Sequence, residues 1–317
     1  MTAAPQAVPS PDVHAALADV IQAANRIILG KENAIRLALA CLIARGHLLI
    51  EDQPGVGKTM LANALARTLG LSFHRIQFTS DMLPADILGA AVYNRDTGSF
   101  TFHPGPIFSQ VILADEVNRA TPRTQSALLE AMEERQVTTE GETRPLPRPF
   151  FVIATQNPSN QVGTFPLPES QLDRFMMRLR LGYPDNRAER DLLKGRDRRE
   201  MLAETVSAMT SADLETLQCQ VAGIHISDAL LDYLQDLLEF SRVSAEYFSG
   251  LSPRAGLAIL RCAQAWALMH RRGHVLPEDV QAVLPSVIGH RLTAHEGQSD
   301  LTGTAAADRL IRQVPVP

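Results

Sequence analysis

The chain has 317 residues and a mass of 34.7 kDa, which is enough for about two domains and for a core that needs no disulfide. Its net charge of −5 and pI of about 6.0 argue against a general nucleic-acid-binding protein, whose domains are usually basic. Three cysteines without C-x-x-C spacing exclude a disulfide framework and a cysteine zinc site.

The N-terminal segment lacks the basic and apolar regions of a signal peptide, and its Pro and Ala content predicts that residues 1–11 are flexible. The longest apolar stretch, around residues 37–50, contains Arg45 and His47. It falls short of the ~18 apolar residues that span a membrane. We therefore expect a cytoplasmic protein without direct membrane insertion.

Hydrophobic periodicity predicts alternating strands and helices in the first part of the chain. The expected strands are residues 47–50, 72–78, 111–114, 150–154 and 176–181, and the expected helices are 13–28, 32–44, 60–69, 124–134 and a turn at 170–174. Two segments, 90–103 and 136–147, have the turn residues of β-hairpins and interrupt the alternation. This order predicts an α/β domain with a five-stranded parallel sheet, helices on both faces and two hairpin inserts.

The pattern changes after Tyr183, where amphipathic helical spacing continues to about residue 272 and another helix begins at Pro277. We therefore predict an α/β domain over residues 12–183 and a smaller all-α domain over residues 184–317. Neither part is basic, and no internal repeat is visible.

A glycine-rich turn between the first strand and the next helix has the context of a P-loop. The residues expected to bind a nucleotide are Pro54, Gly55, Val56, Gly57, Lys58, Thr59 and Met60. Backbone N–H groups of such a turn bind phosphate oxygens, the lysine reaches the β- and γ-phosphates, and Thr59 offers its hydroxyl to Mg²⁺. The full pattern has glycine at the position of Asp52, but this position supplies no phosphate ligand, so we expect binding to survive.

Two carboxylates, Asp115 and Glu116, follow the buried strand 111–114. At the carboxyl end of a parallel strand both face the nucleotide crevice, where Asp115 suits Mg²⁺ and Glu116 suits the polarisation of a water. Taken alone, the pair is equally typical of an acidic helix start. Asn157 follows strand 150–154, and alone it is more often a turn residue before proline.

Together these segments resemble AAA+ ATPases, and several blocks resemble the MoxR family. The blocks are DEVNRA from Asp115, QSALLEAME from Gln125, GPIF from Gly105, TQNP from Thr155, QLDRF from Gln171 and LSPRA from Leu251. The resemblance covers nearly the whole chain from about residue 12. It implies a P-loop AAA+ fold with a helical lid, and it implies ATP and Mg²⁺ as ligands.

The resemblance also implies roles for single residues. Asn157 would be sensor 1, and Arg174 would be the arginine finger that reaches the nucleotide of a neighbouring subunit. Arg254 would be sensor 2, contacting the γ-phosphate of its own subunit, and Gly30 would lie near the adenine. Without the family context, each of these two arginines is more typical of a surface ion pair.

The first functional hypothesis is a MoxR-type AAA+ ATPase that hydrolyses ATP in a ring, expected to be a hexamer. It would remodel or activate a protein client in a chaperone-like role, for example in metal-cofactor insertion or complex assembly. The resemblance implies a partner with a von Willebrand factor A domain. The alternatives are a nucleic-acid motor or transcription-activating ATPase, which the charge balance disfavours, and a poorly hydrolysing nucleotide-binding scaffold, which Glu116, Asn157 and Arg174 disfavour.

Overall fold

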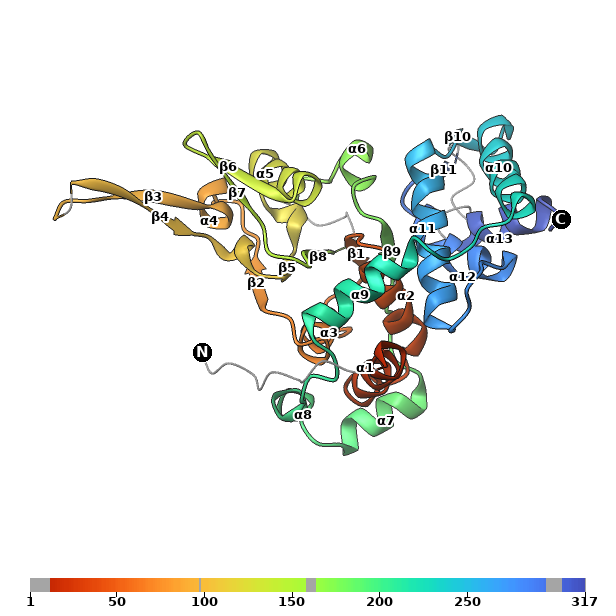
Figure 1. Ribbon diagram of the computed structural model, residues 1–317, viewed down its shortest axis with the longest axis horizontal. Helices are drawn as coiled ribbons and strands as arrows, with labels where there is room; N and C mark the ends of the chain where they lie inside the picture. Colours follow the sequence, from red (N-terminus) through yellow and green to blue (C-terminus); the bar gives the residue numbers. More distant parts are fainter. Residues whose placement is uncertain (1–11, 97, 158–163, 295–303, 317) are drawn as a thin grey trace.

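The computed structural model describes residues 12–96, 98–157, 164–294 and 304–316. The predicted flexible segment, residues 1–11, lies outside these residues. In Figure 1 an α/β part holds a central sheet, and a group of helices coloured cyan to blue lies beside it.

The sheet of the α/β part has five parallel strands in the order β2-β5-β8-β1-β9. Their bounds are β1 Leu48–Glu51, β2 Phe73–Gln77, β5 Val111–Asp115, β8 Phe151–Gln156 and β9 Met177–Leu179. Strands β5, β8 and β1, at its centre, are apolar and almost wholly buried, as expected where both faces of a parallel sheet are covered. The predicted five-stranded parallel sheet is confirmed.

Successive side chains of each central strand enter two different cores, because strand side chains alternate between the faces of a sheet. Leu48, Ile50 and Leu113 face one core, whereas Leu49 and Ile112 face the other. The first core includes helices α1 Val13–Ile27, α2 Glu32–Ile43 and α3 Lys58–Thr68, and the second includes α4 Pro84–Leu88 and α5 Pro122–Glu134. The predicted helices on both faces are therefore present.

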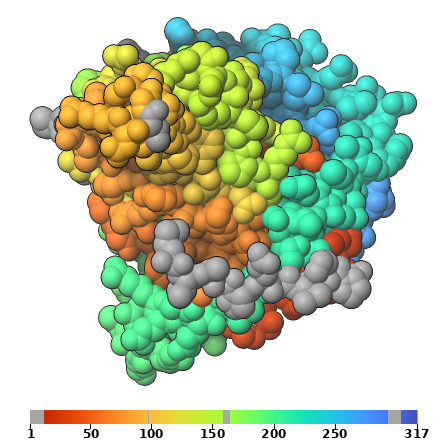
Figure 2. All heavy atoms as spheres, turned by 60° about the vertical axis from the view of Figure 1, so that its left-hand side comes forward, coloured from red at the N-terminus to blue at the C-terminus, as the bar shows by residue number. Residues whose placement is uncertain are grey.

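Both predicted hairpins are formed, by β3 Gly89–Asn94 with β4 Ser99–Pro104 and by β6 Gln136–Thr139 with β7 Glu142–Pro145. The second turns at Glu140 and Gly141, which both have positive φ, as a tight hairpin turn requires. The guanidinium of Arg144 lies 3.9 Å from the ring centroid of Phe102, so the hairpins touch. Figure 2 shows the first hairpin in orange at one corner of the molecule, beside the yellow-green second hairpin.

After β9 the chain forms α7 Asn186–Lys194, α8 Arg198–Glu204 and α9 Ser211–Val221. Helix α8 contacts α1 and α3, and the guanidinium of Arg198 donates to the carbonyl of Arg26, so this segment packs on the α/β part. The predicted boundary near residue 183 stays a prediction.

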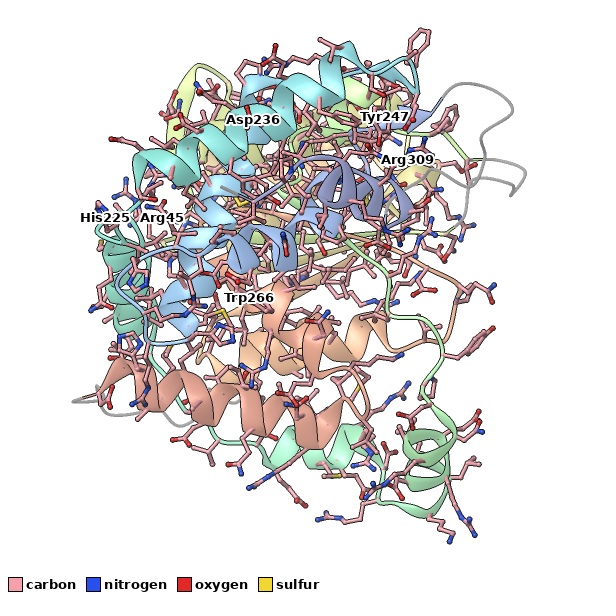
Figure 3. All side chains as sticks on the ribbon, turned by 90° about the vertical axis from the view of Figure 1, so that its right-hand side faces the viewer. Arg45, His225, Asp236, Tyr247, Trp266 and Arg309 are labelled. Atoms are coloured by element: carbon pink, nitrogen blue, oxygen red, sulfur yellow. The ribbon has the colours of Figure 1, made fainter. Side chains whose placement is uncertain are left out.

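The remaining helices are α10 Asp228–Val243, α11 Pro253–Met269, α12 Pro277–Ile288 and α13 Thr304–Gln313. The region is not helical throughout, because β10 Tyr247–Ser249 pairs with β11 Thr293–Ala294. Figure 3 shows Tyr247 and Arg309 close together, where α13 packs beside β10 and the Tyr247 hydroxyl approaches the carbonyl of Ala306 at 3.5 Å. Among the described helices, none has the length and apolarity needed to cross a membrane.

Candidate nucleotide-binding site

The glycine-rich turn joins the end of β1 to the start of α3. Gly55 and Gly57 have φ values of +86° and +97°, a conformation that glycine adopts without strain. A Cβ at either position would meet no atom of the described residues within 4 Å, so the turn faces open space. Helix α3 begins at Lys58 without a side-chain cap, which leaves its first N–H groups able to bind an anion.

Lys58 extends across the turn toward the end of β8. Its Nζ donates to the carbonyl of Asp52 at 2.5 Å and to Oδ1 of Asn157 at 3.1 Å. Burial lowers the pKa of Lys58, and the nearby charges of Asp52, Asp115 and Glu116 partly oppose this shift. The ammonium group is therefore a desolvated charge aimed at the crevice.

The neighbours of Lys58 divide between the turn and the core. Pro54 is exposed, whereas Val56 and Met60 are half-buried and pack on the core that contains α1 to α3. Thr59 is half-buried in the first turn of α3. Val56 and Met60 thus have only their backbone groups to offer a nucleotide, while Thr59 also offers a hydroxyl.

Asp115 ends β5, next to the end of β8. Its Oδ1 accepts a hydrogen bond of 2.5 Å from the hydroxyl of Thr155, and its Oδ2 accepts two from Arg75, at 3.0 and 2.6 Å. The same Thr155 hydroxyl accepts the backbone N–H of Glu116 at 2.9 Å. Thr155 therefore fixes both carboxylate-bearing residues relative to each other.

Glu116 has a left-handed backbone, with φ 57° and ψ 48°. This conformation costs a non-glycine residue about 1–2 kcal/mol and is typical of functional sites. Its carboxylate accepts from Gln77 at 3.1 Å, from Arg119 at 2.8 Å and from Asn157 at 3.0 Å. Because Asn157 also binds Lys58, a continuous hydrogen-bond network runs from the lysine to the glutamate.

Asp52 stands where the full P-loop pattern has glycine, and the structure shows what its carboxylate does. Oδ2 accepts the backbone N–H groups of Leu181 and Gly182 at 2.7 and 2.6 Å, and Oδ1 accepts that of Gln53 at 2.8 Å. Asp52 is not among the described residues with positive φ, so its backbone does not require glycine. The carboxylate instead ties the start of the turn to the segment that follows β9.

Gly30 lies at a cavity of about 650 Å³ between α2, β9 and α12. Its φ is +68°, and a Cβ there would stand 3.0 Å from the Cβ of Ala188. The neighbouring Lys31 donates to the carbonyl of Tyr183 at 2.7 Å, and the Tyr183 hydroxyl donates to Gln53 at 2.6 Å. Gly30 is therefore joined to the glycine-rich turn through residues 181–183.

These residues fit a nucleotide with Mg²⁺. The turn has an open front, a free helix N-terminus and a desolvated lysine, which suit phosphate groups. The Thr59 hydroxyl and the Asp115 carboxylate are oxygen ligands of the kind that Mg²⁺ prefers, together with water and phosphate.

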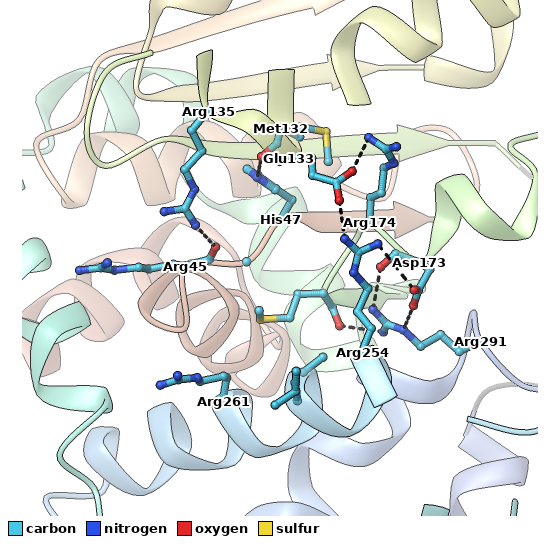
Figure 4. Close-up of a pocket in the computed structure, with 14 residues that line it drawn as sticks. Arg45, His47, Met132, Glu133, Arg135, Asp173, Arg174, Arg254, Arg261 and Arg291 are labelled. Atoms are coloured by element: carbon cyan, nitrogen blue, oxygen red, sulfur yellow. Dashed lines mark hydrogen bonds and ion pairs between the residues drawn. The ribbon is translucent and has the colours of Figure 1, made fainter. Parts of the chain in front are cut away.

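Arg174 and Arg254 lie together in another cavity, of about 260 Å³, and share one carboxylate (Figure 4). Arg174 pairs with Glu133 at 2.7 Å, and Arg254 pairs with the other oxygen of Glu133 at 2.6 Å. The hydrogen bond from Arg254 lowers the pKa of Glu133. Arg254 also approaches Asp173 at 3.9 Å, and Asp173 binds Arg291 at 2.7 Å. Both arginines thus form the ion pairs that their residue type predicts.

This cavity is at the amino ends of the parallel strands, whereas Lys58 is at their carboxyl ends. It is lined by Gly46 and His47, which precede β1, and by Met176, which precedes β9, whereas Lys58 follows β1. A parallel strand of four residues is about 13 Å long. The contact of Arg254 with the γ-phosphate of its own subunit, implied by the resemblance, is therefore not supported. Its physical reason is the packing of α11, which begins beside α5 and not beside the glycine-rich turn.

Sequence reasoning assigned no role to several residues of these two clusters, among them Arg75, Gln77, Arg119, Glu133 and Thr155. Arg75 and Gln77 lie two positions apart on β2, so they share one face, and their polarity on a predicted strand was the available signal. Thr155 is the next-to-last residue of β8 and follows a buried apolar run. Glu133 ends the QSALLEAME block, but the sequence did not indicate its pairing, because its partners come from distant parts of the chain.

Comparison with known proteins gives the family. The profile of the ATPase family associated with various cellular activities (AAA) matches residues 47–177, and that of the AAA lid domain matches residues 239–312. The chain is 38% identical to Chaperone MoxR1 of Mycobacterium tuberculosis, over 92% of this chain and 78% of the relative. It is 32% identical to Protein MoxR of Paracoccus denitrificans, over 96% and 98% of the two chains.

A solved structure agrees with these relatives. The crystal structure of a putative ATPase from Cytophaga hutchinsonii has a TM-score of 0.88 and 36% identity, and each chain is covered to 96%. The described residues therefore share the fold of that structure. The chain therefore belongs to the MoxR family of AAA+ ATPases.

Proposed function

We propose that this protein hydrolyses ATP with Mg²⁺ in a hexameric ring and uses the energy to remodel or activate a protein partner. One observation carries the proposal. Lys58, Asn157 and Glu116 form a continuous network beside Asp115, which joins a phosphate-binding cation to a base and a metal-binding carboxylate.

Each residue has a task that its geometry supports. Lys58 and the backbone of the turn bind the phosphates, and Asn157 orients the Glu116 carboxylate through its amide. Glu116 accepts the proton of the attacking water. Thr59 and Asp115 would hold Mg²⁺, which would supply neutralisation of the phosphate charge.

Arg174 and Arg254 act on the nucleotide of a neighbouring subunit. Both guanidiniums pair with Glu133 at the amino ends of the strands, whereas Lys58 of the same chain lies at the carboxyl ends. A planar guanidinium suits transition-state charge on phosphate. In this proposal both guanidiniums leave Glu133 when the neighbour's nucleotide is present. The need for a second subunit is the argument for a ring.

The client is a protein and not a nucleic acid. The net charge of −5 gives no electrostatic basis for phosphate-backbone binding. The proposed partner carries a von Willebrand factor A domain, as the resemblance to the MoxR family implies, and the proposed setting is the cytoplasm. Complex assembly or metal-cofactor insertion would be the purpose.

The test is Glu116→Gln, which keeps the size and the hydrogen-bond capacity of the side chain but removes the base. We expect ATP affinity to stay within about threefold of the wild type, while turnover falls at least about 100-fold. Binding is measured with a fluorescent ATP analogue, and turnover by phosphate release. Size-exclusion chromatography with ATP should show the ring.

Glu215→Gln, at an exposed position of α9, is the matched control and should retain full turnover. Wild-type-like hydrolysis by Glu116→Gln would contradict the assignment of the base. A wild-type protein that binds ATP but does not hydrolyse it would favour the scaffold alternative. Salt-dependent DNA binding would favour the nucleic-acid motor.

A further inference from the structure

The carboxylate of Asp115 is already bound to a cation of the protein. Arg75 on β2 donates from Nε and from Nη2 to Oδ2 of Asp115, at 3.0 and 2.6 Å. Among the described residues, Arg75 is the ion-pair partner that Asp115 has. Lys58 donates instead to Asp52, Asn157 and the carbonyl of Gln156.

The acceptor capacity of this carboxylate is nearly used. An ionised carboxylate has about four lone-pair sites. Arg75 occupies two on Oδ2, and the Thr155 hydroxyl occupies one on Oδ1. One site remains, on Oδ1. A hydrated Mg²⁺ needs several such sites for its water molecules, so Arg75 and the metal compete for Oδ2.

The two partners differ in how easily they can move. The side chain of Asp115 is 10% exposed and held by Thr155, whereas that of Arg75 is 48% exposed. The half-exposed guanidinium already contacts water, so it is not left in the protein interior when it leaves Asp115 and its second partner, Gln77, to which it donates at 2.8 Å. Arg75 can therefore leave while Asp115 stays in place.

We infer that Arg75 is the resident cation of Asp115 in the metal-free protein and competes with Mg²⁺ for its carboxylate. Arg75 thereby sets the Mg²⁺ concentration at which the site binds nucleotide tightly. The inference rests on the proposed function, because it concerns the same site, and it assigns a role to a residue outside the P-loop and the acidic pair.

The inference predicts that nucleotide affinities with and without metal change in opposite directions. In Arg75→Gln, Asp115 is left without its cation, so its charge repels phosphate in metal-free solution and affinity falls. With Mg²⁺ the competitor is gone, so affinity rises. A residue that only supports the fold would weaken both affinities together.

The experiment measures the dissociation constant of a fluorescent, non-hydrolysable ATP analogue in EDTA and in saturating Mg²⁺. We expect the dissociation constant in EDTA divided by that in Mg²⁺ to rise at least about threefold in Arg75→Gln. The Mg²⁺ concentration at which binding is half tightened should fall by a similar factor. Arg75→Lys keeps the positive charge but loses the two hydrogen bonds of the guanidinium, so its ratio should lie between those of the wild type and Arg75→Gln. Arg196→Gln removes an exposed ion pair with Glu204 and should leave the ratio unchanged.

An unchanged ratio in Arg75→Gln, or equal weakening in both solutions, would overturn the inference and leave the proposed function standing. If the wild-type protein binds the analogue in neither solution, the proposed function itself fails. Thermal melting of each variant confirms that the affinities belong to folded protein.

Discussion

The parallel strands have their amino ends on one side of the central sheet, the amino edge, and their carboxyl ends on the other, the carboxyl edge. The clusters of charged side chains at these two edges are built differently. At the carboxyl edge, Lys58, Asn157 and Glu116 are joined by hydrogen bonds into one network around a turn that is open at its front. At the amino edge, Arg174 and Arg254 converge on a single carboxylate, Glu133. The carboxyl edge contains a cation and the two carboxylates proposed as base and metal ligand, whereas the two arginines at the amino edge pair with one carboxylate.

This difference is the basis of the proposed division of labour between neighbouring subunits. A site with binding groups and a base can act on a ligand, but two arginines paired with Glu133 need an anion from outside to displace that carboxylate. The lowered pKa of Glu133 means that protonation near neutral pH does not release them. The following predictions test whether the edges are as distinct as their contacts suggest.

The largest effect is expected at the carboxyl edge from Lys58→Ala. It removes the desolvated ammonium group from the centre of the network, so we expect ATP affinity to fall by more than about 100-fold, as for loss of a charged hydrogen-bond donor. Equilibrium binding of a fluorescent ATP analogue measures the loss. Lys194→Ala, at an exposed position on α7, is the control and should bind normally. Retained binding by Lys58→Ala would remove the basis for treating this edge as the nucleotide site.

At the amino edge, Arg174→Ala and Arg254→Ala should each leave ATP affinity nearly unchanged and lower turnover by about 10²- to 10³-fold, at or below the range of arginine fingers in GTPases. Mixing either variant with Lys58→Ala subunits should restore part of the turnover, because each subunit then supplies what its neighbour lacks. Phosphate release at several mixing ratios measures the rescue. For Arg254, rescue separates action on a neighbour from action within one subunit. Absence of rescue for both arginines would contradict the division of labour.

A smaller effect is expected from Asp52→Gly, which restores the full P-loop pattern. It removes three hydrogen bonds to backbone N–H groups, each worth about 1 kcal/mol, so we expect lower thermal stability and about three- to tenfold weaker ATP binding. Asp52→Asn retains one acceptor oxygen and should be less affected. Calorimetry and the same binding assay suffice. If Asp52→Gly binds and melts like the wild type, the carboxyl edge does not depend on the segment after β9.

The smallest effect concerns the pH dependence of folding stability. It depends on His47, which precedes β1 and lines the same cavity as Arg174 and Arg254. His47 Nδ1 accepts the N–H of Val152 at 3.0 Å and Nε2 donates to Met132 at 3.1 Å, so the ring is neutral. Burial lowers the pKa of His47 to about 4. The unfolded chain takes up this proton near pH 6.5 and the folded chain does not, so stability falls as the pH drops from 6.5 toward 4.

At pH 5 this difference amounts to roughly 2 kcal/mol for His47. Urea unfolding at pH 7.5 and pH 5 measures the loss in the free energy of unfolding. This loss should be smaller in His47→Gln than in the wild type. The control, His74→Gln at an exposed position, should show the same loss as the wild type. An equal loss in His47→Gln and the wild type would show that another group carries the pH dependence.

The convergence of Lys58, Asp115 and Asn157 could be predicted, because parallel strands end at one edge of a sheet. Asp115 is the last residue of β5, and the other two residues follow β1 and β8. The position of Arg254 could not, because it depends on how α7 to α9 return along the α/β part before α11 begins. Arg75 was visible as a polar residue on a strand, but its partner was not. Only the strand order, which puts β2 beside β5, brings its guanidinium to Asp115.

The bonds of Asp52 also have a consequence for local unfolding. Strand β9 has three residues and is an outermost strand of the sheet, a place where strands usually fray first. Leu181, which follows β9, donates its backbone N–H to Asp52 at the start of the glycine-rich turn, 129 residues away in the sequence. Detachment of this strand therefore releases the turn as well, so amide hydrogens of residues 52–53 and 181–182 should exchange with solvent as one cooperative unit.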